Sequence, residues 1–557
     1  MKYVLIFILL ISFAGGTTSE LRLDIMFTND IHGGIDSYPA TFMNPEFPPI
    51  LGGGGSAATY IKEVRSMTDG IIRDNLLIDV GDFFQGHPIG TVSKGKAVIK
   101  YFNMMEYDLS VVGNHEYDLG EETLIEAYED ANFPILSCNI ISRETGELVD
   151  YVKPFIIMEK LGIKIGIIGL TTTDTELMSF PDNIKNVDFL PAKECLEKYI
   201  AIVKDAGADI IMVVGHMGLP YEPEPAYQAR YLGDSDMKER YWGYDAQELA
   251  HEVPGIDIFF GGHMHRGFAE PWEDPVTHTL VFQGWAYGSS IGHVTLKIDG
   301  ESRTLAGYEL PAIREGALIT LFEDQFLPDP VIGDTILAMQ MEAEKGMDDI
   351  IGKALNYISR EGNDAQNLIG NLVCEAMLEA TGADFAFMNL GGVRGELNRG
   401  PISYRDVFNV MPFDNQIVVM EVDGMFLKNI IETRVSGSRH GLRVAGVKIT
   451  YSRDRDNYDR VTRLIIGSEP WKYDRIYKVV TTDFLLQGNA GLALLTKIPD
   501  DQITRYEKSL RDAIADYVRI NSPVSASLDD RWVRDDDAGL SEELAKELAR
   551  SRTDINR

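Results

Sequence analysis

Short apolar runs recur along the first half of the chain, and several of them end in a cluster of polar residues. Five such runs are LRLDIMFTNDIHG, NLLIDVGDFFQG, LSVVGNHEYD, IIMVVGHMG and IDIFFGGHMH. Runs of Ile, Val, Leu and Phe this continuous are typical of strands buried on both faces of a sheet. Helical patterns such as SAATYIKEVRSM and AKECLEKYIAIVKDAG lie between them. The alternation predicts a layered α/β domain over residues 20–325, with the chemistry on loops at strand ends.

The pattern changes after this first domain. The segment FLPDPVIGDTILAMQMEAEKGMDDIIGKAL begins with prolines and continues with apolar residues at helical spacing. This pattern predicts a linker helix within residues 326–347. A second domain is expected over residues 348–522, from the helix QNLIGNLVCEAMLEATG to strand-like runs such as DNQIVVMEVDG and YKVVTTDFLL. Residues 523–557 are charged throughout, which predicts a loosely attached or disordered tail with an exposed helix from Ser541 to Arg550.

The N-terminus, MKYVLIFILLISFAGGTTSE, has the pattern of an export signal. One lysine precedes an apolar run that is too short to span a membrane, and small residues follow it. We expect residues 1–19 to be a cleavable signal peptide of a periplasmic or secreted protein without a membrane anchor. The net charge of −34 argues against nucleic acid or an anionic membrane as a partner. The chain has only three cysteines, Cys138, Cys195 and Cys374. They are too few and too far apart to form a disulfide framework.

The polar clusters carry side chains that suit divalent metal ions. They are Asp30, His32, Asp82, Asn114, His115, His216, His263 and His265. Carboxylate and amide oxygens mixed with imidazoles favour Zn²⁺, Mn²⁺ or a similar ion. The set is large enough for two ions that share one carboxylate, and such ions can activate a water and bind a phosphoryl oxygen. In the GNHEYD turn, Asp118 follows His115 by three residues and can orient its imidazole.

The motifs NDIHGG, GDFFQG, GNHEYD, GHMG and GGHMH, in this order, resemble the five blocks of the 5′-nucleotidase family of calcineurin-like metallophosphoesterases. The resemblance implies a four-layer αββα metallophosphoesterase domain, followed by a linker helix and a smaller α+β substrate-binding domain. It implies one ion held by Asp30, His32, Asp82 and His265. It implies a second ion held by Asp82, which bridges, and by Asn114, His216 and His263. His115 and Asp118 resemble the catalytic dyad, which stabilises the transition state and helps the leaving oxygen depart.

Three motifs of the second domain, NLGGVRGEL, MPFDNQ and TTDFLLQGNAGLALL, are similar to the nucleoside site of the same family. They give the substrate-binding candidates Asn389, Arg394, Phe413, Asn415 and Phe484. The resemblance implies that the two phenylalanine rings stack on a base, at about 1–3 kcal/mol per stacked base, and that the amide of Asn415 hydrogen-bonds it. The alternative, in which both phenylalanines are only core residues, stays open.

Two positions depart from the family's pattern. Ala490, in GNAG, stands where the family has an aspartate that holds the ribose hydroxyls. Ala365 and Gln366 stand where the family has an arginine and a glutamate, and Arg360 is nearby but out of register. These changes leave the metal chemistry intact but weaken the expectation of a nucleotide substrate.

The leading hypothesis is an exported phosphohydrolase with two divalent ions, Zn²⁺, Mn²⁺ or Co²⁺. It would hydrolyse phosphate monoesters, chiefly nucleoside 5′-phosphates but also di- and triphosphates or sugar nucleotides, by in-line attack of a water activated between the ions. One alternative is a related hydrolase of another ester, a 2′,3′-cyclic phosphodiesterase or a thiosulfohydrolase-like enzyme. Another is a non-catalytic binding protein on the same scaffold, against which the intact His115–Asp118 pair argues.

Two further features of the sequence each have two possible interpretations. The segment Leu219–Tyr244 is long and rich in Pro and Tyr, and it is either a surface elaboration or a rim that contacts the substrate. His87 lies just after a ligand motif and is either an ordinary structural histidine or a support for the metal ligands.

Overall fold

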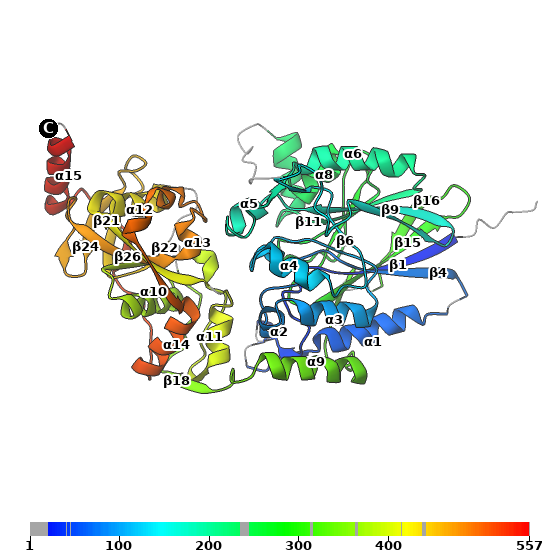
Figure 1. The fold of residues 1–557 in the computed structure, drawn as a ribbon, viewed down its shortest axis with the longest axis horizontal. Helices are drawn as coiled ribbons and strands as arrows, with labels where there is room; N and C mark the ends of the chain where they lie inside the picture. The colour runs from blue at the N-terminus through cyan, green and yellow to red at the C-terminus, as the bar shows by residue number, and fades with distance from the viewer. Residues whose placement is uncertain are drawn as a thin grey trace, which may run out of the picture.

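The computed structural model describes residues 20–555, except 41, 45, 69, 234–243, 312–315, 363–365, 414 and 437–441. The predicted signal peptide and position 365 therefore lie outside the described residues. Two bodies lie side by side, residues 20–320 forming most of one and residues 350–555 the other (Figure 1). None of the described helices is both long and apolar enough to cross a membrane.

The first body contains two sheets. One has the strand order β16-β15-β1-β4 with β17 paired to β15, and the other has the order β13-β14-β12-β11-β9-β8. Within them β1 runs parallel to β4, and β9, β11, β12 and β14 run parallel to one another. The strands are β1 Glu20–Thr28, β4 Ile72–Asp79, β8 Phe155–Lys160, β9 Ile163–Thr171, β11 Ile210–His216, β12 Ile258–Gly261, β13 Trp272–Glu273, β14 Leu280–Gln283, β15 Ser290–Asp299, β16 Thr304–Glu309 and β17 Leu318–Thr320.

Three apolar cores separate the layers of this body. Alternate residues of one strand enter different cores: Met212 and Val214 of β11 fill the space between the sheets. Their neighbours Ile211 and Val213 pack instead under α6 (Ala192–Asp205) and α8 (Ala246–Glu252). On the other side, α1 (Gly53–Arg65) and α3 (Lys96–Met105) cover the first sheet. The predicted four-layer αββα arrangement is therefore confirmed, with helices above and below two stacked sheets (Figure 1).

Helix α9 (Pro330–Ala343) lies within the segment that the sequence predicts as a linker helix. The Asp329 carboxylate caps it by accepting hydrogen bonds from the main-chain NH groups of Val331 and Ile332. Ile332 and Ile336 of this helix enter the core beneath α1 and α3. The linker is thus packed on the first body, and the chain reaches the second body through β18 (Ile350–Ala354) (Figure 1).

The second body is built on a five-stranded sheet with the order β22-β19-β26-β21-β27. The predicted helix and both predicted strand runs are present, as α10, β21 and β26. The strands are β19 Phe385–Asn389, β21 Gln416–Asp423, β22 Leu442–Ala445, β26 Ile476–Thr482 and β27 Ile503–Ser509. The helices packed into its core are α10 Leu368–Thr381, α12 Gly424–Ser436 and α14 Leu510–Asn521. The short helices α11 (Tyr404–Val410) and α13 (Asp483–Leu486) lie on the side facing the first body (Figure 1).

The expectation of a loosely attached tail after residue 522 is wrong. Strand β28 (Trp532–Arg534) pairs in parallel with β23 (Val447–Tyr451), and the Trp532 side chain is buried against Tyr451. The predicted helix is present as α15 (Glu542–Ile555), and its Leu544 is buried in the core of the second body. Charge alone misled the prediction, because a few apolar residues among many charged ones suffice to attach a segment.

The long segment after β11, rich in Pro and Tyr, is helical in part. It contains α7 (Pro223–Tyr227) and a π-helical turn, η2 (Gln228–Leu232), while residues 234–243 lie outside the described part. Tyr227 is buried and packs against Trp272 and His251 of the same body. The described portion is therefore attached to the outer helical layer that contains α8.

Candidate metal centre

The five polar motifs meet at one edge of the two sheets, because each follows the carboxyl end of a strand. Asp30 and His32 follow β1, and Asp82 follows β4. Asn114 and His115 follow the short strand β5 (Ser110–Val111), His216 ends β11, and His263 and His265 follow β12. Parallel strands bring their carboxyl ends to the same side of a sheet, so residues far apart in sequence become neighbours.

The backbone at these positions adopts an uncommon conformation. Five of the predicted ligands have left-handed φ values: Asp30 50°, His32 49°, Asp82 55°, His263 72° and His265 51°. Such a conformation costs about 1–3 kcal/mol, persists only where the surrounding structure holds it, and is concentrated at functional sites. Main-chain hydrogen bonds hold two of them, from Asp30 to Gly81 O at 3.0 Å and from His32 to Asp82 O at 2.9 Å. This backbone strain lowers the stability of the fold, and it directs the candidate ligands toward one site.

One group of four side chains, Asp30, His32, Asp82 and His265, has ligand atoms within 4.8 Å of one another. The Nε2 atoms of His32 and His265 lie 2.9 Å apart, facing each other. The Nδ1–H of His32 donates to the Gln85 carbonyl at 2.6 Å, which leaves Nε2 as the lone-pair nitrogen. Two imidazoles pointed at one spot, beside two carboxylates, fit a shared divalent ion.

A second group, Asp82, His216 and His263, shares the Asp82 carboxylate with the first. The Nδ1–H of His216 donates to Val80 O at 2.7 Å, so its Nε2 is the nitrogen left to bind an ion. This Nε2 is completely buried, lies 3.0 Å from Asp82 Oδ2, and makes no hydrogen bond within the described residues. The Asn114 amide oxygen approaches Nδ1 of His263 to 2.9 Å. The buried His216 nitrogen beside the shared carboxylate, together with His263 and the amide oxygen next to it, fits a second ion.

The predicted dyad lies beside both groups. His115 Nδ1 is 2.6 Å from Asp118 Oδ2, and its ring centroid is 5.1 Å from that of His32. Burial lowers the pKa of His115, but the carboxylates of Asp118 and Asp82 outweigh it and raise the pKa to about 9. With Nδ1 engaged by Asp118, Nε2 is the nitrogen that can meet a substrate.

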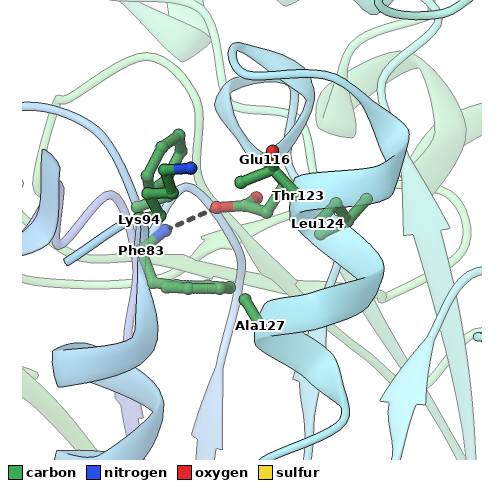
Figure 2. Close-up of a pocket in the computed structure, with 7 residues that line it drawn as sticks. Phe83, Lys94, Glu116, Thr123, Leu124 and Ala127 are labelled. Atoms are coloured by element: carbon green, nitrogen blue, oxygen red, sulfur yellow. Dashed lines mark hydrogen bonds between the residues drawn. The ribbon is translucent and has the colours of Figure 1, made fainter.

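Glu116, inside the same turn, was not singled out from the sequence. Its buried carboxylate accepts main-chain NH hydrogen bonds from Asp82 at 2.9 Å, Phe83 at 3.0 Å and Gly113 at 2.6 Å. Figure 2 shows the bond from Phe83, with Lys94 and Thr123 nearby; these residues line a cavity of about 10 Å³, close to the volume of one water site. The carboxylate thus ties the Asp82 loop to the GNHEYD turn, a role that motif reading does not reveal.

Two of the substrate-binding candidates of the second body lie beside the predicted dyad, Phe413 and Arg394. The Phe413 ring stacks on His115 with centroids 6.2 Å apart and planes at 16°, and the Arg394 guanidinium lies 5.3 Å from the Phe413 centroid. Phe484 meets the edge of Phe180 from the first body at 5.8 Å. Both phenylalanines are half-buried, whereas Asn415 is buried. Asn389 lies at the end of β19, and its side-chain Oδ1 is buried without a hydrogen bond among the described residues.

Ala490 and Arg360, at or near the positions that depart from the family's pattern, have different surroundings in the structure. Ala490 is exposed and left-handed (φ 54°), and its carbonyl accepts a hydrogen bond from the Arg434 guanidinium. Arg360, out of register in sequence, donates from Nη1 to the main-chain oxygen of Arg394 at 3.0 Å. The guanidiniums of Arg394 and Arg360 both lower the pKa of Tyr287, which burial raises. Two arginines therefore lie within electrostatic reach of a tyrosine beside the metal ligands.

Sequence comparison covers both bodies. Residues 23–267 match the calcineurin-like phosphoesterase family, and residues 350–497 match the 5′-nucleotidase C-terminal domain. The 5′-nucleotidase of Vibrio parahaemolyticus is 26% identical over 534 residues, which cover 91% of this chain and 90% of that protein.

Two solved structures share the fold. The 5′-nucleotidase precursor of Thermus thermophilus matches with a TM-score of 0.75 and 24% identity, over 92% of this chain and 99% of that one. The Thermus thermophilus sulfate thiohydrolase SoxB, in complex with glycerol, matches with a TM-score of 0.69 and 16% identity, over 92% and 96%. Because proteins named for different esters share the architecture, the fold leaves the substrate open. The two matched domains, in this order and around this His/Asp cluster, make the chain a member of the 5′-nucleotidase family of calcineurin-like phosphoesterases, which are metal-dependent hydrolases.

Proposed function

We propose that the protein is an exported phosphatase that binds two divalent ions and removes the phosphate of nucleoside 5′-phosphates. The observation that carries the proposal is the pair of ligand groups that share Asp82, next to the hydrogen-bonded His115 and Asp118. One ion would be held by Asp30, His32, Asp82 and His265. The other would be held by Asp82, Asn114, His216 and His263. Bound ions of this kind act as Lewis acids and make a water nucleophilic at neutral pH.

The chain's own residues supply the remaining chemistry. His115, oriented by Asp118, can in its protonated form donate a hydrogen bond from Nε2 to the phosphoryl group as charge develops, and can pass a proton to the leaving oxygen. Asp118 holds the ring through Nδ1 at 2.6 Å, so the imidazole does not reorient during the reaction. Such general acid catalysis contributes typically about 10²–10⁴-fold to a rate.

The second body would hold the leaving group and the phosphate charge. Arg394 carries a fixed positive charge next to Phe413, and Arg360 adds a second one close by. Two guanidiniums offset the repulsion that a chain of net charge −34 exerts on an anion. Phe413 and Phe484 present half-buried rings, on which a nucleobase can stack. Asn389 and Asn415 would then supply hydrogen bonds to the nucleoside.

The location is proposed from the N-terminal sequence. Residues 1–19 have the composition of a cleavable signal peptide, which favours a periplasmic or secreted enzyme.

A substrate panel tests the function. The chelator-treated protein is reconstituted with Mn²⁺, Zn²⁺ or Co²⁺ and offered AMP, 2′,3′-cyclic AMP, UDP-glucose, a cysteine S-sulfonate and p-nitrophenyl phosphate. We expect phosphate release with kcat/KM highest for AMP. A preference for the cyclic diester or for the sulfur compound would move the protein to the corresponding alternative. The absence of turnover of every ester with both ions bound would favour a binding protein.

A further inference from the structure

The ring of Tyr287 packs against both His32 and His265 of the metal centre. The Tyr287 centroid lies 5.4 Å from that of His32, with planes at 35°, and 5.2 Å from that of His265, with planes at 85°. It also stacks on His87 at 6.2 Å. Tyr287 follows β14 in a loop, and no motif of the sequence analysis included it.

His265 differs from His32 and His216 in how it is held. His32 and His216 each direct the nitrogen that is not a candidate ligand to a main-chain carbonyl, at 2.6 and 2.7 Å. Within the part of the chain that the structure describes, Nδ1 of His265 has no such partner, and the side chain is 26% exposed. Metal-binding histidines are normally oriented through that second nitrogen. The rings of Tyr287 and His32 pack against His265, with centroids 5.2 and 4.8 Å from its own.

The position of Tyr287 is itself strongly fixed. Its backbone is left-handed (φ 60°), which is unfavourable for a bulky side chain. The main-chain NH donates to Asp30 O at 2.8 Å, and the main-chain oxygen accepts from Tyr38 Oη at 3.2 Å. The ring is thus anchored to the loop that carries Asp30 and His32. A half-buried ring at a strained position joined to a ligand loop indicates a specific task for the side chain.

We propose that Tyr287 is a positioning residue whose ring, rather than its hydroxyl, sets the orientation of His265 and His32 toward one ion. The inference rests on the proposed two-ion function, because it concerns the residues assigned to one of the ions. Where His32 and His216 use a main-chain carbonyl, the Tyr287 ring would restrict the His265 imidazole through an edge-on contact.

Calorimetric titration with Mn²⁺ of the chelator-treated full chain tests this inference without any substrate. Tyr287→Leu removes the ring at an unchanged backbone, and we expect the Kd of one of the two ions to rise by about 10–100-fold, the usual effect of losing a group that supports a metal ligand. Tyr287→Phe keeps the ring and should restore affinity to within about threefold of wild type. The Co²⁺-loaded Leu variant should also show an altered absorption spectrum, and the Phe variant should not.

Tyr231→Leu is the matched control. Tyr231 packs on His251 with centroids 4.0 Å apart, in the same body but away from the ligand cluster, so its loss should leave both affinities unchanged. If Tyr287→Leu does not fold, Tyr287→Asn takes its place, because Asn accepts a left-handed backbone more readily. Unfolding of both variants would make Tyr287 a general packing residue and overturn the inference.

Two other results would also overturn it: wild-type affinity for both ions in the Leu variant, or an equal loss in the Phe and Leu variants, which would assign the role to the hydroxyl. A wild-type protein that binds two ions but hydrolyses no ester would contradict the proposed function alone. A wild-type protein that binds no ion would contradict both.

Discussion

The metal centre and the facing surface of the second body are built in different ways. The candidate ligands lie at strand ends, most of them buried, on left-handed backbone that main-chain hydrogen bonds hold in place. Across from them, Arg394 is exposed and Phe413 and Phe484 are half-buried. The two phenylalanines pack against His115 and Phe180 of the first body rather than only against their own core.

This difference assigns the reaction to the metal centre of the first body and the choice of substrate to the second body. A preorganised, buried cluster suits chemistry that tolerates little displacement of the reacting groups. Partly exposed rings and an arginine on the other body can adapt to the leaving group. Substitutions in the first region should therefore change metal binding or kcat for every substrate, whereas those in the second should change the ranking of substrates.

The largest effect is expected at His115. His115→Ala should lower kcat by about 10²–10⁴-fold for every phosphate ester, because a general acid is lost. Metal content should remain at two ions, since His115 is not among the proposed ligands. His216→Ala is the comparison, and it should deplete one ion. Elemental analysis together with steady-state kinetics gives both readouts, and an equal loss of metal from the two variants would show that the roles are wrongly assigned.

Gly113→Ala should damage the same region without removing a functional group. A Cβ at this position would lie 2.2 Å from Asp82 Oδ1 and 2.7 Å from Glu116 Oε2, so the shared carboxylate must move. We expect metal affinity to fall by about 10–100-fold. Gly333→Ala in α9 is the control, because its Cβ would make only an ordinary contact, at 3.6 Å. Unchanged metal affinity in Gly113→Ala would mean that the Asp82 loop is more adaptable than its hydrogen bonds indicate.

Phe413→Ala and Phe484→Ala test the second region. Each should weaken AMP binding by about 1–3 kcal/mol through the loss of stacking. Hydrolysis of p-nitrophenyl phosphate should suffer less, because this ester does not need a base site. The ratio of kcat/KM for the two substrates measures the selective part of the effect. Equal losses for both esters would indicate that the phenylalanines support the fold or the dyad instead of a base.

The smallest effect concerns the ribose. Wild type should discriminate poorly between AMP and 2′-deoxy-AMP, because Ala490 offers no carboxylate to a hydroxyl. Ala490→Asp should introduce a preference for AMP of about 1–3 kcal/mol, the usual cost of leaving a polar group unpaired. The left-handed backbone there suits Asp better than most residues. A strong preference for AMP already in wild type would mean that another residue binds the ribose.

The sequence was most informative where polar residues directly follow a predicted strand. Continuous apolar runs followed by Asp, Asn and His predicted a layered α/β domain with its chemistry on loops at strand ends, and parallel strands bring such ends to one side of a sheet. Glu116 and Tyr287 were missed, since their roles depend on hydrogen bonds and ring contacts between loops far apart in sequence. Arg360 was out of register, and only the fold brings it to Arg394. The last segment was misjudged because Trp532 and Leu544 are few among many charges.

The most direct test of the account is a stoichiometric Mn²⁺ titration of the chelator-treated protein, with AMP hydrolysis recorded at each step. Because the two ligand groups share Asp82, activity should remain near zero without metal and reach its plateau at two ions per chain. Full activity with one ion per chain, or with none, would contradict the two-ion centre on which the proposed function depends.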